Sequence, residues 1–259
     1  MSIDALLFVN WIFWAALSAG TLLVVGLTEV AGGTTRGYRL FMAGLLVVFA
    51  AILVASDLAL PPGTPASATE ELRRPLSFGF AAGTVAYLVA SVLRWPRAWL
   101  AVATGGVGLA ALVVLAAAGG SRSAPIFASQ LILAALALGA VNAGMLLGHW
   151  YLVTPKLSPT PLRRMMWLLI GVLVVQGLAF GLALAAVGTD PISGELAWLT
   201  WLRLGVGILL PIVATVLAML ASRAASLQAS TGLLYIGLAL VMAGSIAGAS
   251  ITYLTGVPV

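Results

Sequence analysis

Apolar residues occur along this chain in eight long runs, separated by short connections that hold most of the charged residues. Each run is close to the ~20 residues that a helix needs to cross the hydrocarbon core of a bilayer. Only helices and closed barrels satisfy every backbone hydrogen bond in lipid, and continuous apolar runs of this length are typical of helices. The pattern predicts transmembrane helices at about residues 5–29, 38–60, 76–93, 98–119, 126–152, 165–187, 198–221 and 230–254.

Composition agrees with this pattern. Of the 259 residues, 62% are hydrophobic and 7% charged, and the mean hydropathy is +1.16. A soluble domain of this length has no interior large enough for so much apolar surface. We therefore predict an all-α integral membrane protein, an eight-helix bundle that forms a single transmembrane domain over residues 1–259. Its halves, 1–119 and 120–259, each hold four spans. The first ten residues include Asp4 and no basic residue, which favours a retained first span over a cleaved signal peptide.

The basic residues predict how the bundle lies in the membrane. The net charge of +5 comes from Lys and Arg in short connections, so we interpret it as a topology signal and not as a nucleic-acid surface. The positive-inside rule then places both termini outside (N-out and C-out) and makes this a multi-pass protein of the cell inner (cytoplasmic) membrane. The connections assigned to the cytoplasm carry Arg36, Arg39, Arg94, Arg97, Lys156, Arg163, Arg164 and Arg223.

The residue inventory limits the cofactors that the chain can hold. It has no cysteine, so we expect no disulfide, no iron–sulfur cluster on this chain and no covalent haem. With one histidine, His149, two histidines cannot ligate a haem b within the chain. No metal site is expected, because the carboxylates fall on separate spans without the usual ligand spacing. A haem held by His149 with Met145, Met165 or a partner's ligand stays an alternative.

His149 lies near the end of the fifth predicted span and is the first candidate for a site. Asn142, seven residues earlier, falls on nearly the same helical face. Trp150 and Tyr151 are aromatics typical of the membrane–water boundary. An ionisable group at this depth suggests a ligand or proton site, in which Glu29 at the same end of the bundle would take part. The alternative is a histidine hydrated at the level of the lipid headgroups.

A second set of polar residues is predicted at the opposite, outer end. Asp57 ends the second span, Arg203 lies several residues into the seventh, and Gln130 belongs to the fifth. Because unpaired charges in lipid are costly, we predict that Asp57 and Arg203 form a pair. The alternative is that Arg203 extends outward to Glu195 or Asp190. The sequence leaves open whether the outer set or the inner set of Glu29, His149 and Tyr151 is the working site. The candidate catalytic residues are thus His149, Asp57 and Glu29, and the candidate ligand-binding residues are Asn142, Trp150, Tyr151 and Arg203.

Two further patterns concern packing and the surface. Glycines four residues apart let neighbouring helices approach closely. In the connection 61–75, Glu70 and Arg74 are also four apart, which predicts a short helix with solvated ion pairs. This connection is either a solvated loop or a docking surface for an extracytoplasmic partner. The glycine pairs are Gly79/Gly83, Gly144/Gly148, Gly177/Gly181 and Gly244/Gly248.

Three short motifs in the first 90 residues are similar to those of the NrfD/polysulfide-reductase-C family of quinone-interacting membrane anchors. The matching segments are Trp11-Ile12-Phe13-Trp14 with Ala16-Leu17-Ser18-Ala19-Gly20, Ser56-Asp57-Leu58 with Pro61, and Pro75-Leu76-Ser77-Phe78-Gly79. The second half of the chain departs from that family's pattern.

The resemblance implies eight helices with the N-terminus outside and a subunit without a redox cofactor of its own. It implies a quinone or quinol, menaquinone or ubiquinone, bound beside an acidic residue, with electrons exchanged with an iron–sulfur partner subunit. It makes Asp57 the candidate proton-handling group. The leading hypothesis is therefore a membrane subunit of a respiratory electron-transfer complex. The alternatives are a secondary transporter or permease, and a structural or assembly subunit without chemistry of its own.

Overall fold

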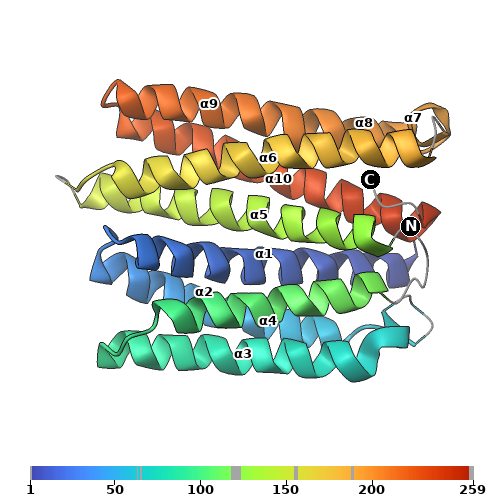
Figure 1. Ribbon diagram of the computed structural model, residues 1–259, viewed down its shortest axis with the longest axis horizontal. Helices are drawn as coiled ribbons and strands as arrows, with labels where there is room; N and C mark the ends of the chain where they lie inside the picture. The colour runs from blue at the N-terminus through green and yellow to red at the C-terminus, as the bar shows by residue number, and fades with distance from the viewer. Residues whose placement is uncertain are drawn as a thin grey trace.

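The computed structural model describes residues 2–62, 64, 66–117, 124–154, 157–187 and 190–256. Within these ranges the chain is helical, without strands, and eight helices are long and apolar enough to cross a membrane. The helices run back and forth along one long axis (Figure 1). The elements are α1 (Ile3–Ala31), α2 (Arg36–Leu58), the short 3-10 helix η1 (Ser67–Thr69), α3 (Glu70–Leu93), α4 (Ala98–Ala117), α5 (Ala124–Val153), α6 (Thr160–Val187), α7 (Asp190–Ser193), α8 (Ala197–Leu204), the π-helix η2 (Gly205–Leu209), α9 (Leu210–Arg223) and α10 (Leu227–Thr255).

The eight predicted segments are confirmed as helices that are long and apolar enough to cross a membrane, with shifts at their ends. Thr35 caps α2 by accepting a hydrogen bond from the backbone N–H of Tyr38, so α2 starts two residues before the predicted position. The largest shift is in α3, which begins at Glu70 and passes through Pro75. Pro75 is the sixth residue of α3 and has no N–H, so the backbone bond to the carbonyl of Glu71 is missing at this point of the helix.

An even number of crossings brings both chain termini to one end of the bundle, which we call the terminal end (Figure 1). The start of α1, the end of α2, the start of α3 and the end of α10 all lie there. The other end, which we call the basic end, holds the connections α1–α2, α3–α4 and α9–α10. Its described arginines are Arg36, Arg39, Arg94, Arg97, Arg163, Arg164 and Arg223.

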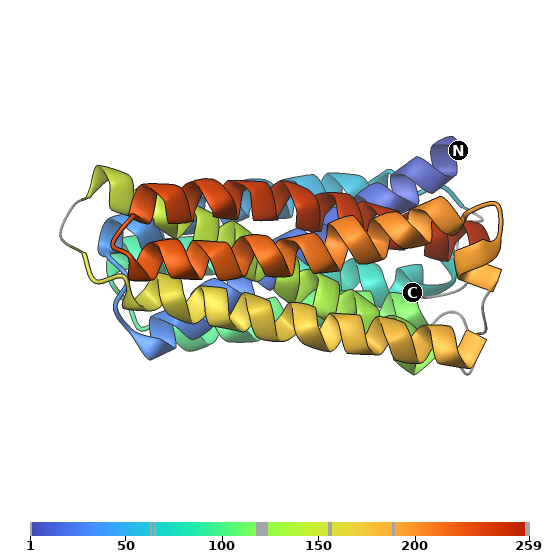
Figure 2. The same ribbon diagram turned by 90° about the horizontal axis from the view of Figure 1, so that it is seen from above.

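Helices α1 and α5 form the centre of the bundle and are far more buried than the other spans. Helices α2, α3 and α4 lie on one side of this pair, and α6, α9 and α10 on the other (Figures 1 and 2). The two central helices touch backbone to backbone. A Cβ on Gly20 would lie 1.8 Å from the carbonyl oxygen of Ala135, and a Cβ on Gly139 would lie 2.1 Å from the carbonyl carbon of Gly20. Only glycine fits at these two positions.

The seventh span is not a regular helix. Helix α8 passes into the π-helical segment η2, and α9 then starts with Pro211 in its first turn. Here η2 touches α10, since a Cβ on Gly244 would lie 2.1 Å from the Cα of Gly207. Wider π-helical turns inside α-helices are frequent at functional sites. This one directly follows Arg203.

Candidate functional site

Asp57 is the centre of a polar network at the terminal end. Its side chain is 0% exposed, although it lies in the last turn of α2. Arg73 of α3 forms a salt bridge to Oδ2. The Trp11 indole Nε1–H of α1 donates to the same oxygen at 2.9 Å, and the Ser77 hydroxyl donates to it at 2.8 Å. Three helices therefore meet at one carboxylate.

Arg73 is held on two sides. Its guanidinium carbon lies 4.8 Å from the centre of the Trp11 ring, and the π electrons of the ring attract the cation. Arg73 and Asp57 are both buried, so each charge has lost its hydration and is stabilised by the opposite charge beside it. Next to this pair, Asn10 donates from Nδ2 to the Ser56 hydroxyl at 2.8 Å. The network thus fixes α1, α2 and α3 relative to one another.

Arg74 connects Asp57 to the surface. Its Nε lies 3.4 Å from Asp57 Oδ1, and its Nη1 lies 2.5 Å from a carboxylate oxygen of Glu70. Its side chain is 31% exposed and lines an open cleft of about 570 Å³ at the start of α3. The cleft combines charged groups with apolar ones. Its lining residues are Ser67, Glu70, Glu71, Arg74, Pro75 and Phe78.

The predicted pair of Asp57 with Arg203 is wrong. Asp57 takes Arg73 and Arg74 as partners, because α3 starts earlier than the sequence pattern suggested and carries both arginines into the bundle. Arg203 lies on α8, in the other half of the chain. A usable signal was present: Arg73, Ser77 and Thr84 fall at helical spacing on one buried face of α3.

The inner candidates are not brought together. Glu29 accepts a hydrogen bond from the Tyr87 hydroxyl and lies 3.3 Å from Nε of Arg97, both contributed by the α3–α4 side of the bundle. His149 points away from this pair and is exposed, with its Nδ1 3.3 Å from the hydroxyl of Tyr235 on α10. Glu29 therefore neither orients His149 nor exchanges a proton with it directly.

The other candidates on α5 make contacts within the bundle. Asn142 donates from Nδ2 to the Thr21 hydroxyl at 3.2 Å, beside the close crossing of α5 with α1. Trp150 covers Gly37 of α2, where a Cβ would meet the indole ring at 2.5 Å. Tyr151 is buried. None of these three side chains lines the cleft at the start of α3.

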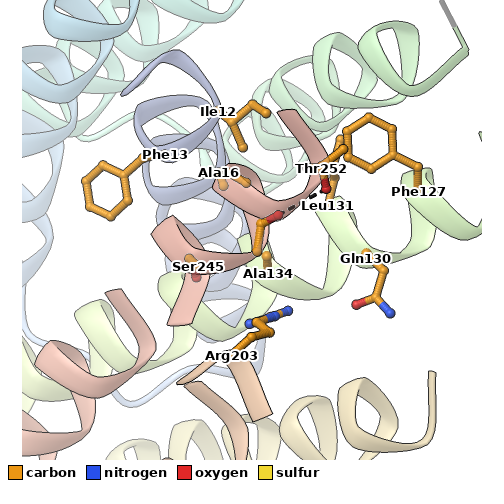
Figure 3. Close-up of a pocket in the computed structure, with 12 residues that line it drawn as sticks. Ile12, Phe13, Ala16, Phe127, Gln130, Leu131, Ala134, Arg203, Ser245 and Thr252 are labelled. Atoms are coloured by element: carbon orange, nitrogen blue, oxygen red, sulfur yellow. Dashed lines mark hydrogen bonds between the residues drawn. The ribbon is translucent and has the colours of Figure 1, made fainter. Parts of the chain in front are cut away.

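Arg203 lies in a separate small cavity in the terminal half of the bundle, between α1, α5, α8 and α10 (Figure 3). The cavity has a volume of about 30 Å³. Gln130 of α5 and Ser245 and Thr252 of α10 supply its other polar groups, and the Thr252 hydroxyl donates to the backbone carbonyl of Gly248 at 3.0 Å. Phe13 and Phe127 are among its apolar residues. Gln130 and Arg203 were predicted to belong to one set, and both line this cavity.

The site chemistry is therefore that of charged hydrogen-bonding groups. In the described part of the chain, no three His, Cys, Asp or Glu residues are grouped so that they hold a metal ion. Comparison with protein-family models, with curated proteins and with solved structures finds no match to this chain. The resemblance to the NrfD/polysulfide-reductase-C family stays a prediction that rests on the first 90 residues.

Proposed function

We propose that this protein is a quinone- or quinol-binding membrane subunit of an electron-transfer complex, and that its ligand lies in the cleft at the start of α3. One observation carries the proposal: Arg74 joins this cleft to the buried carboxylate of Asp57. The cleft volume of about 570 Å³ lies within the range of small-molecule sites, which combine apolar walls with a few polar groups.

The lining residues suit a quinone head group. Phe78 is a large exposed aromatic that stacks on a flat ring, and Pro75 adds apolar surface. The guanidinium of Arg74 donates to a carbonyl oxygen. Reduction of a quinone takes up two electrons and two protons, and Glu70 and Glu71 at the rim are carboxylates that exchange protons with water. The electrons come from, or go to, a redox partner subunit that docks at the same end.

In this proposal Asp57 is a positioning residue. All of its described contacts are donors within the bundle, so a ligand in the cleft meets Arg74 first. The negative charge of Asp57 holds the Arg74 guanidinium at the cleft wall. Direct proton transfer between Asp57 and the ligand would require that the contact with Arg74 opens.

We also propose the N-out and C-out orientation in the cytoplasmic membrane, which directs the cleft outward. The basic end has a second cleft of about 380 Å³, lined by Ser91 and four arginines, which suits the anionic lipids of a cytoplasmic leaflet. Exposed tryptophans occur near both ends, as at the two interfaces of a bilayer: Trp198 and Trp201 near the terminal end, and Trp95, Trp99 and Trp167 near the basic end.

Equilibrium binding of short-chain ubiquinone and menaquinone analogues to the protein in lipid nanodiscs tests the function. We expect saturable binding of one molecule per chain, and a loss of at least tenfold in affinity in Arg74→Gln and in Phe78→Ala. Arg164→Gln is the matched control, because Arg164 is an exposed arginine at the basic end. Equal, non-saturable partitioning into nanodiscs with and without the protein would refute a quinone site.

A further inference from the structure

Arg203 is a buried cation without a counter-charge among the described residues. It is 3% exposed, and its Nε has no hydrogen-bond partner. No described carboxylate forms a salt bridge with it, and none lines its cavity. A guanidinium keeps its charge under all ordinary conditions, so it cannot become neutral to avoid the cost of burial.

Two other polar side chains of the cavity, Gln130 and Ser245, are also unsatisfied. Gln130 is 5% exposed, and neither its amide nitrogen nor its amide oxygen has a partner. The hydroxyl oxygen of Ser245 is buried and unpaired as well. Buried polar groups are nearly always hydrogen-bonded, so three unsatisfied side chains around one cavity point to an occupant. Guanidinium, amide and hydroxyl together offer N–H and O–H donors to it (Figure 3).

Glycines shape the space around the guanidinium. A Cβ on Gly248 would lie 3.1 Å from Arg203 Nε, and a Cβ on Gly207 would lie 3.5 Å from its Nη1. Gly207 and Gly244 allow η2 and α10 to touch directly beside it. The arginine is thus accommodated by the backbone of α10 and η2, although no charged side chain balances it.

The size of the cavity limits the occupant. About 30 Å³ corresponds to the space of two or three water molecules, since one water requires roughly 10–15 Å³ of such volume. We propose that the cavity binds a single monatomic anion of the halide class, with chloride as the physiological ion, held by Arg203, Gln130 and Ser245. A quinone ring is too large for it. The proposal does not depend on the quinone function, whose cleft lies on α3.

Thermal unfolding of the purified protein tests the proposal when chloride replaces gluconate at constant ionic strength. A ligand that binds only the folded state raises the midpoint with the logarithm of its concentration, by roughly 5–10 °C at one hundred times Kd for a chain of this size. We expect this rise for chloride and bromide. Gln130→Leu keeps the arginine but removes the amide and fills space, and should reduce the rise by more than half.

Radiolabelled chloride binding gives a second measurement that does not depend on stability. We expect one ion per wild-type chain and none in Arg203→Gln. Arg163→Gln is the matched control: it removes an arginine that bonds Ser222 at the basic end, and should keep chloride binding even if it lowers the midpoint. Equal midpoints in chloride and gluconate, with no bound label, would show that the cavity holds water only. If chloride does not bind but quinone does, the chloride site is refuted and the proposed quinone function is unaffected.

Discussion

Arg73 and Asp57 form a buried ion pair that ties the start of α3 to the end of α2. The pair is shielded by the Trp11 ring and completed by the Ser77 hydroxyl. Removing the charge of one partner leaves the other charge buried and uncompensated. This lowers stability more than replacing both partners by apolar residues. The interaction therefore gives a sharp test of the fold at the terminal end.

Asp57→Asn and Arg73→Met should each lower the free energy of unfolding by about 3–5 kcal/mol. The double variant should lose clearly less than the sum, because neither charge is then left alone. Urea or thermal unfolding in detergent measures this. Asp57→Asn combined with Arg203→Gln is the control and should be additive. Coupling of Asp57 with Arg203 instead of Arg73 would contradict the observed pairing.

The contact of Gly20 with Gly139 predicts that small side chains are harmful at the centre of the bundle. Gly139→Ala adds one methyl group that would lie 2.1 Å from the backbone of α1, so the two helices must separate. We expect a loss of about 1–3 kcal/mol in unfolding free energy. Gly171→Ala on α6 is the control, because no atom lies within 4 Å of its new Cβ. It should be neutral or slightly stabilising, and equal effects would argue against the close crossing.

His149 is expected to tolerate substitution. Its side chain is exposed and has one long contact to Tyr235, as in a histidine at the level of the headgroups. His149→Gln should change stability by less than about 0.5 kcal/mol and leave quinone binding unchanged. Glu29→Gln, which weakens the contacts with Arg97 and Tyr87, should be the more harmful change at the same end. Loss of ligand binding in His149→Gln at normal protein abundance would instead support the ligand site suggested by the sequence.

The proposed orientation is testable because the chain has no cysteine of its own. Ala68→Cys places a thiol at an exposed position of the terminal end, and Ser158→Cys places one at an exposed position of the basic end. An impermeant maleimide added to intact cells should label only Ala68→Cys. Membrane disruption should make both positions reactive, which serves as the control. Labelling of Ser158→Cys in intact cells would reverse the topology.

The sequence predicted the number and the approximate limits of the spans, because hydrophobicity along a chain directly reports which segments tolerate lipid. It was less informative about lateral contacts. Of the glycine pairs, Gly83, Gly148 and Gly244 lie tightly against neighbours, whereas Gly181 has none within 4 Å. Gly20 and Gly139 belong to no such pair, yet they form the closest crossing of the central helices. The spacing of glycines shows which face of a helix carries small residues, but it does not show which neighbouring helix packs on that face.

The candidate site was predictable in part, because the hydrophobicity of the chain also shows where charged residues interrupt apolar runs. Asp57 and Arg203 stand out because charges in apolar runs are rare, and both are buried. Their partners depend on the three-dimensional order of the helices and on the true start of α3. The third span was predicted to begin at residue 76, so Arg73 and Arg74 were assigned to the connection 61–75. Hydrogen-bonded neighbours from α1, such as Trp11, carry no sequence signal of that role.

The central pairing of α1 with α5 has a consequence for biogenesis. Thr21 and Asn142, which bond across this contact, are 121 positions apart. At translation rates of about 5–20 residues per second, α1 leaves the ribosome roughly 6–24 s before the part of α5 that it contacts. During that interval its glycine- and hydroxyl-bearing face has no permanent partner. The first helix is thus synthesised well before it can pack against α5.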